Sequence, residues 1–84
     1  MEKERRTRSL SSLSRGERAC VCCVTLSASA KRRLCEIGFN PGSYVTCLGR
    51  GPLGDPAAYL ARDRIIAIRR RDAAKIKCIT EEVL

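Results

Sequence analysis

Two clusters of proline and glycine interrupt the middle of this chain and limit the length of any element around them. The segment Asn40-Pro41-Gly42-Ser43 predicts a type II turn, because proline fixes φ at the first central position and glycine accepts the positive φ of the second. Gly51–Pro56, with two prolines and two glycines, predicts a loop. A chain of 84 residues forms one domain at most, and its core is limited to about five short strands.

Short apolar or alternating segments lie between these breaks and predict strands. Val45 and Cys47 share one face of their segment, whereas Tyr44 and Thr46 share the other. Further segments of this kind have the length and composition of strands, and we expect strands at residues 19–26, 44–48, 57–61, 65–69 and 75–78. The pattern predicts a mainly β fold, a small closed or nearly closed antiparallel barrel that hides its edges.

Helical spacing follows the first predicted strand. Over residues 30–37 apolar side chains recur every three or four positions, which places them on one helix face. Ser27 or Ser29 can cap the start of this helix, and Gly38 can end it with Phe39 folded back on the last turn. Asp72 predicts the cap of a single helical turn near the end of the chain.

The charge distribution sets the expected domain limits. Residues 1–8 are almost wholly charged and predict a mobile basic tail, residues 9–80 form the domain, and residues 81–84 form a C-terminal tail. The expected core consists of the apolar side chains that share the inner faces of the predicted elements: Val21, Val24, Leu34, Ile37, Phe39, Val45, Cys47, Ile66, Ile68 and Ile76.

The chain has six cysteines and no histidine. No secretory signal or membrane span is apparent, so we expect a cytoplasmic protein whose thiols stay reduced. Cys20 and Cys22 share a strand face, but a closed zinc site needs four ligands, so Cys35, Cys47 or a second chain would have to contribute. Buried cysteine commonly packs as a small hydrophobe. We therefore expect no metal and no cofactor, with a thiolate metal carrier as the weakest alternative.

Catalytic signatures are missing from the sequence, which points to a protein that acts by binding. There is no histidine base, no Gly-x-Ser-x-Gly elbow and no phosphate-binding Gly-x-x-x-x-Gly-Lys-Ser/Thr segment. The net charge is +8, with basic clusters at residues 3–8, 31–33 and 69–71. Such clusters suit an acidic protein, an acidic membrane surface or nucleic acid. Three aromatic residues are too few for a base-stacking platform.

Three segments together resemble the FeoA family of ferrous iron transport proteins. Residues 32–42, RRLCEIGFNPG, resemble the family segment RRLxxxGfxPG, and residues 51–56, GPLGDP, resemble its aPLGDP loop. Residues 66–76 resemble its lalRrxeAxxI close, and Leu10, Leu13 and Gly16 match its opening. The resemblance covers about residues 10–79.

This resemblance implies an SH3-like antiparallel β-barrel of about five strands with one short helix inserted after the first strand. It also implies a cytoplasmic, non-enzymatic accessory protein that binds and modulates FeoB, a permease whose cytosolic part is a GTPase. A small-molecule substrate and direct membrane insertion are not expected, and the oligomeric state, a homo-oligomer included, stays open. The alternative is a small basic SH3-like module that binds nucleic acid or acts as a regulator.

The chain departs from the family pattern in two places. Asp63 stands where a hairpin glycine is usual, and aspartate tolerates left-handed backbone less well than glycine but better than most residues. Cysteine occupies positions 20, 22, 23 and 35, where the family commonly has Val, Lys or Leu. The first departure concerns hairpin geometry, and the second leaves room for a redox or metal role.

We expect the partner-binding surface to combine the helix with the proline-glycine loop. Leu53 is an apolar residue at a predicted loop tip, where packing or a partner would account for it. Arg32 and Arg33 offer forked donors suited to carboxylates. The predicted contact residues are Arg32, Arg33, Pro52, Leu53, Gly54, Asp55 and Pro56.

Overall fold

The computed structural model describes residues 3–24, 27–36 and 38–83. Across these ranges, six strands form one antiparallel sheet in the order β1-β6-β2-β3-β4-β5. The strands are β1 (Lys3–Ser9), β2 (Arg18–Val24), β3 (Tyr44–Arg50), β4 (Ala57–Ala61), β5 (Arg64–Ile68) and β6 (Ile76–Val83). The 3-10 helix η1 (Leu10–Ser12) and the α-helices α1 (Ala28–Glu36) and α2 (Arg70–Ala73) connect them. The expected mainly β fold is confirmed.

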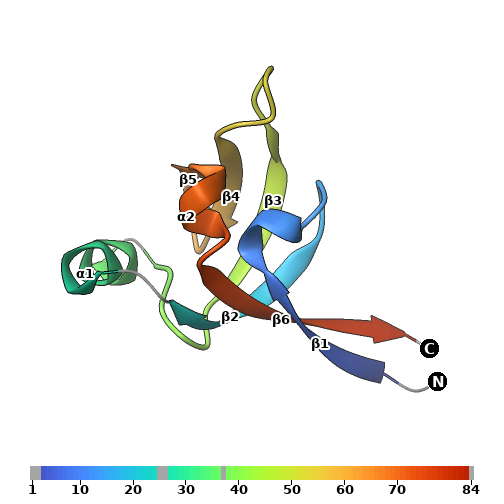
Figure 1. Ribbon diagram of the computed structural model, residues 1–84. Coiled ribbons are helices and arrows are strands. Elements are labelled where there is room, and N and C mark those ends of the chain that lie inside the picture. Colours follow the sequence, from blue (N-terminus) through green and yellow to red (C-terminus); the bar gives the residue numbers. More distant parts are fainter. Residues whose placement is uncertain (1–2, 25–26, 37, 84) are drawn as a thin grey trace.

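The sheet is open rather than closed, which corrects the predicted barrel of about five strands. Its hydrogen-bonded order begins at β1 and ends at β5, and none of the strand pairings of the described residues joins these two edges. The additional strand is β1, which pairs with β6 as a ribbon that leaves the body of the molecule and brings the two chain ends together (Figure 1). β1 therefore extends away from β5 instead of closing the sheet.

Residues 3–8, expected in a mobile tail, lie in β1, and residues 81–83, expected in a second tail, lie in β6. The register runs from Lys3 opposite Val83 to Ser9 opposite Lys77. The main chain makes this pairing. The charged sequence of β1 has no apolar alternation, so the sequence pattern does not predict a strand there.

The boundaries of α1 follow local signals that the sequence contains. The Ser27 hydroxyl accepts a 3.3 Å hydrogen bond from the Ala30 N–H and caps the helix, so Ser27 rather than Ser29 has this role. Gly38 adopts φ 108°, and the Phe39 N–H donates to the Leu34 carbonyl at 2.9 Å. This is the predicted glycine end with Phe39 folded back. The helix begins two residues earlier than expected.

The turn at residues 40–43 is confirmed and also joins two strands. The Ser43 N–H donates to the Asn40 carbonyl at 2.9 Å, and Gly42 has φ 92°. Val21 of β2 then bonds both sides of the turn: its N–H donates to Ser43 O, and its carbonyl accepts from Gly42 N–H, both at 2.8 Å. The turn therefore positions the start of β3 against β2.

The β4–β5 hairpin places its left-handed residue one position earlier than the sequence indicated. Arg62 has φ 59°, whereas Asp63 is not among the residues with positive φ. Ala61 pairs with Arg64, so Arg62 and Asp63 are the two residues of the turn. A two-residue hairpin needs positive φ at its first central position, and here that position is Arg62.

Most of the predicted core is buried. Val21, Phe39, Val45, Cys47, Ile68 and Ile76 have at most 6% of their surface exposed, and Leu34 and Ile66 pack against them while partly exposed. Ile37 and the side chain of Val24 lie outside the described residues.

A second group of core residues was missed: Leu10, Leu13, Tyr59, Cys78 and the alanines at 19, 57, 61 and 73. Tyr59 is central to this group. Its ring meets Phe39 edge to face, with centroids 6.4 Å apart, and its hydroxyl donates to the Leu10 carbonyl at 3.3 Å. Tyr59 thus fixes η1 over the inner face of the sheet, because a buried tyrosine hydroxyl needs a hydrogen-bond partner.

Candidate functional site

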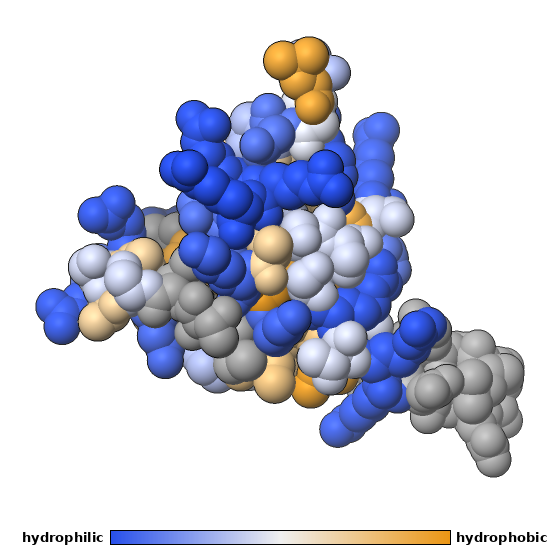
Figure 2. Space-filling view, viewed as in Figure 1, coloured by the Kyte–Doolittle hydropathy of each residue, from blue (hydrophilic) through white to orange (hydrophobic). Residues whose placement is uncertain are grey.

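The loop between β3 and β4 carries five of the predicted contact residues and projects from one end of the sheet (Figure 1). The Gly51 N–H donates to the Pro56 carbonyl at 3.0 Å, and the Gly54 N–H donates to the Gly51 carbonyl at 2.8 Å. Leu53 is 95% exposed at the tip, and Figure 2 shows an isolated hydrophobic tip there. Internal hydrogen bonds therefore shape a loop whose apolar tip side chain is exposed to solvent.

Asp55 in this loop has a structural contact that the sequence did not reveal. Its Oδ1 accepts a 2.8 Å hydrogen bond from the Arg70 N–H, in the first turn of α2. The cap position of α2 itself is Arg69, which makes no side-chain cap bond, so the predicted cap by Asp72 is wrong. The carboxylate that satisfies this helix end comes from a loop 15 positions away.

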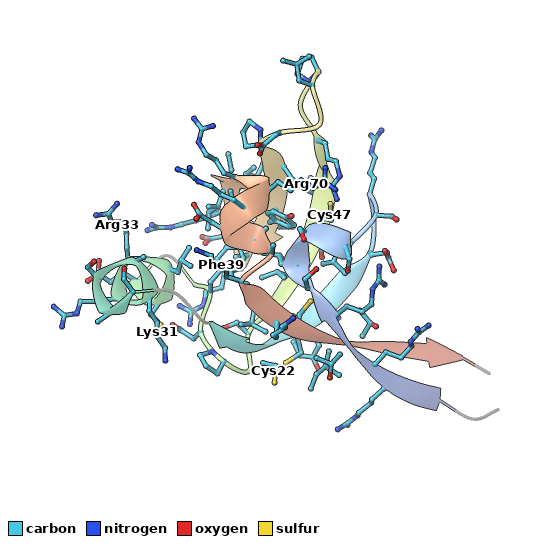
Figure 3. The ribbon with its side chains drawn as sticks, viewed as in Figure 1. Cys22, Lys31, Arg33, Phe39, Cys47 and Arg70 are labelled. Atoms are coloured by element: carbon cyan, nitrogen blue, oxygen red, sulfur yellow. The ribbon has the colours of Figure 1, made fainter. Side chains whose placement is uncertain are left out.

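Arg32 and Arg33 are exposed on α1, a helix with no buried residue among those described. Figure 3 shows Arg33 and Lys31 pointing to opposite sides of this helix. In Figure 1, α1 stands beside the sheet, whereas the β3–β4 loop stands at its end, with β4, β5 and α2 between them. The predicted contact residues thus form two separate surfaces.

A groove between α1, β5 and α2 was not foreseen from the sequence. It has a volume of about 390 Å³. Apolar side chains of α1 and β5, among them Leu34 and Ile66, form its floor, and its basic rim consists of Arg33, Arg69 and Arg71. Figure 2 shows hydrophilic side chains crowded over α2 and around α1. The sequence contains the Arg69–Arg71 run, but only the fold places it beside Arg33.

The outer face of the sheet carries a smaller aromatic and basic feature. The Arg18 guanidinium lies 4.2 Å from the centre of the Tyr44 ring, and Tyr44 is 55% exposed. Arg62 and Leu60 line the shallow depression beside them. A cation over an exposed ring already occupies one aromatic face, which leaves little of it for a base to stack on.

The cysteines lie in different environments. Cys22 is exposed, Cys20 and Cys35 are half-buried, and Cys47 and Cys78 are buried. Figure 3 shows Cys22 at the lower margin of the sheet and Cys47 in its interior. Burial raises the pKa of the Cys78 thiol to about 11, and this thiol donates to the Arg8 carbonyl at 3.3 Å.

The residues that the structure describes include no group of three or more His, Cys, Asp or Glu side chains able to hold a metal ion. The side chain of Cys23 lies outside them. The helices in the described ranges are also too short and too polar to cross a bilayer.

Comparison with known proteins assigns the family. Residues 8–79 match the FeoA domain. An Fe(2+) transport protein A/Fe(2+) transporter FeoB fusion protein of Porphyromonas gingivalis is 37% identical over 68 residues, which cover 81% of this chain and 8% of that protein. This chain therefore spans a small part of the length of the curated relative that it matches.

Solved structures agree with this match. The FeoA protein of Chlorobium tepidum has a TM-score of 0.79 and 32% identity, over 92% of this chain and 70% of that chain. FeoA of Stenotrophomonas maltophilia, complexed with zinc and described as a procaryotic SH3 domain protein, has a TM-score of 0.73 and 27% identity, over 89% and 95% of the two chains. The family match runs from the end of β1 to the middle of β6, and the chain belongs to the FeoA domain family.

Proposed function

We propose that this protein is a non-enzymatic cytoplasmic accessory protein of ferrous iron uptake that binds the cytosolic part of a FeoB-type permease and modulates it. The observation that carries the proposal is the Porphyromonas relative, in which an Fe(2+) transport protein A and FeoB are joined in one polypeptide. A covalent link keeps two domains at a high effective concentration. A separate chain needs a binding surface to reach the same association.

The β3–β4 loop supplies the first part of that surface. Leu53 is held in solvent by a loop that is already shaped by its own hydrogen bonds, so little conformational entropy is lost when a partner covers it. Pro52 and Pro56 restrict this loop, Gly54 allows its positive φ of 80°, and Asp55 ties it to α2.

The exposed arginines Arg32 and Arg33 of α1 supply the second part. They lie on a different side of the molecule from the loop tip, so a single partner must be large enough to reach both surfaces (Figure 1). A folded cytosolic domain of a permease meets this requirement, whereas a small molecule does not. The +8 charge of the chain favours an acidic partner surface.

A second candidate is a basic module that binds nucleic acid or acts as a regulator. The observation in its favour is the net charge of +8. Binding to phosphates weakens steeply with salt because counterions are released. Salt dependence therefore separates the two candidates.

The direct test measures binding of the purified chain to the cytosolic part of the FeoB-type permease of the same organism. We expect saturable binding, a changed GTPase rate of the permease part, and much weaker binding to duplex or single-stranded nucleic acid at physiological salt. A chain that binds neither the cytosolic part nor the detergent-solubilised permease, or that binds nucleic acid more tightly, contradicts the proposal.

A further inference from the structure

Strand β5 is an open edge of the sheet. Within the described residues it pairs with β4 alone, and Ala61 opposite Arg64 closes the hairpin. In a two-residue hairpin the closing pair shares hydrogen bonds, and the pairs then alternate between bonded and non-bonded. Ile65 and Ala67 fall in the non-bonded pairs, opposite Leu60 and Ala58. Their N–H and C=O groups therefore point away from β4, toward the open edge.

The groove of about 390 Å³ described above runs beside this edge. A strand that extends the sheet at β5 would place alternate side chains toward Leu34 and Ile66, which are partly exposed, and the others beside Ile65, which is 71% exposed. An extended segment that binds as an added strand needs unpaired main-chain N–H and C=O groups and an apolar groove beside them. The β5 edge offers both.

The rim determines which segment fits. Arg33, Arg69 and Arg71 line the groove, and within the described residues none of the three forms an ion pair. The one acidic side chain of the lining is Asp72. Basic side chains on this rim favour an occupant with carboxylates.

A second copy of this chain is the less suitable occupant. Arg64 is the first residue of β5, and Arg69 follows its last residue. If β5 paired with β5 of another copy, these arginines would come close to the arginines at the ends of the other β5. Like charges that face each other across paired strands are destabilising. Charge complementarity therefore points to a different, acidic chain.

We propose that the β5 edge and its groove bind an extended segment of a partner protein in which apolar residues alternate with aspartate or glutamate, as an added strand. The main chain of Ile65 and Ala67 supplies the ladder hydrogen bonds, and Leu34 and Ile66 receive the apolar side chains. Arg33, Arg69 and Arg71 meet the carboxylates. This site goes beyond the proposed contact through Leu53 and Arg32, and it holds whichever protein supplies the segment.

The experiment uses the full chain labelled with ¹⁵N and two capped synthetic peptides of equal length, one alternating valine with glutamate and one alternating valine with lysine. We expect the glutamate peptide to shift the amide signals of residues 64–69 and of α1, and to slow amide exchange at Ile65 and Ala67 several-fold. The lysine peptide should leave these signals unchanged. Equal binding of both peptides, shifts confined to β1, or no shift at millimolar peptide each overturn the proposal.

Matched variants locate the contacts. Arg69→Glu and Arg71→Glu, made singly, should each weaken binding of the glutamate peptide by about threefold, whereas Arg15→Glu, an equal change of charge at an exposed turn away from β5, should not. Ala67→Pro removes the outward N–H and should weaken binding, whereas Ala67→Val keeps it. If the proline variant is unfolded, amide exchange in the parent chain and the arginine variants still decide the outcome.

The same labelled protein tests the alternative occupant. If amide exchange at Ile65 and Ala67 slows as the concentration of the free chain rises, with a matching increase in molecular mass, the occupant is a second copy and the proposal is wrong. Failure of the permease to bind, by contrast, contradicts the proposed function and leaves this site unaffected.

Discussion

The Asp55 carboxylate accepts a 2.8 Å hydrogen bond from the backbone N–H of Arg70 and so fastens the β3–β4 loop to the first turn of α2. α2 has four residues, and its own cap residue, Arg69, makes no side-chain hydrogen bond. The contact satisfies one of the N–H groups that a helix start leaves without an intrahelical partner. It also connects the loop that carries Leu53 to the element that carries Arg69 and Arg71.

Replacement of this carboxylate should therefore destabilise the fold. We expect Asp55→Ala to lower the free energy of unfolding by about 0.5–2 kcal/mol, as for other lost helix caps. Asp55→Asn keeps an oxygen acceptor and should retain most of the stability. Urea unfolding followed by circular dichroism measures both values. Equal stability of the parent and the alanine variant would show that the hydrogen bond contributes nothing.

Leu53 and Arg32 should affect binding to the permease without affecting the fold, because both side chains are exposed. We expect Leu53→Ala to speed dissociation from the cytosolic part of the permease, since it removes an apolar anchor. Arg32→Glu should instead slow association and reduce its salt dependence. Surface plasmon resonance separates the two rates.

Alanine substitution of Ser29, an exposed position on α1, supplies the control for that experiment: Ser29→Ala should bind as the parent does. If Leu53→Ala and Arg32→Glu both fold and bind as well as the parent, the contact surface lies elsewhere on the molecule.

Glu17 should make stability depend on pH in the acidic range. Its carboxylate accepts from Arg8 at 2.7 Å and from the Ser14 N–H at 2.6 Å, and these bonds hold its pKa below the usual 4.5. A depressed pKa stabilises the folded state fully above the unfolded value, and this stability is lost as pH falls through the folded pKa. The ion pair is partly exposed, so its contribution is about 0.2–1 kcal/mol.

The variant Glu17→Gln tests this assignment. At pH 7 it should be less stable than the parent by about this amount, and the two proteins should converge in stability as the pH falls below 4.5. Thermal unfolding over a series of pH values provides the measurement. A constant difference between parent and variant down to pH 2 would rule out the carboxylate as the cause.

The thiols should differ in reactivity. The thiolate is the reactive form, and the buried Cys78, with a pKa of about 11, is almost entirely protonated at pH 8. We expect iodoacetamide to modify the exposed Cys22 first, and Cys47 and Cys78 only after unfolding in urea. Mass spectrometry of tryptic peptides identifies the modified positions. Rapid labelling of Cys78 in the folded protein would contradict the buried position of this side chain.

Residues close in sequence allowed several features to be predicted. Ser27 and Gly38 mark the two ends of α1, and Gly42 marks the turn before β3, because a cap or a turn involves groups only a few positions apart. The inward alternation of Val45 and Cys47 likewise follows from the strand period of two. The family resemblance, confirmed over residues 8–79, rests on such local segments in their order.

Tertiary structure alone decided the rest. β1 is a strand because its main chain meets β6 some 70 positions later, as in the pair Arg8 and Cys78, and a backbone ladder needs no particular side chains. The sheet stays open because β1 is added beyond β6 rather than beside β5. Asp55 caps α2, and Arg33 meets the Arg69–Arg71 run across a groove, because the chain path brings together groups that share no local spacing.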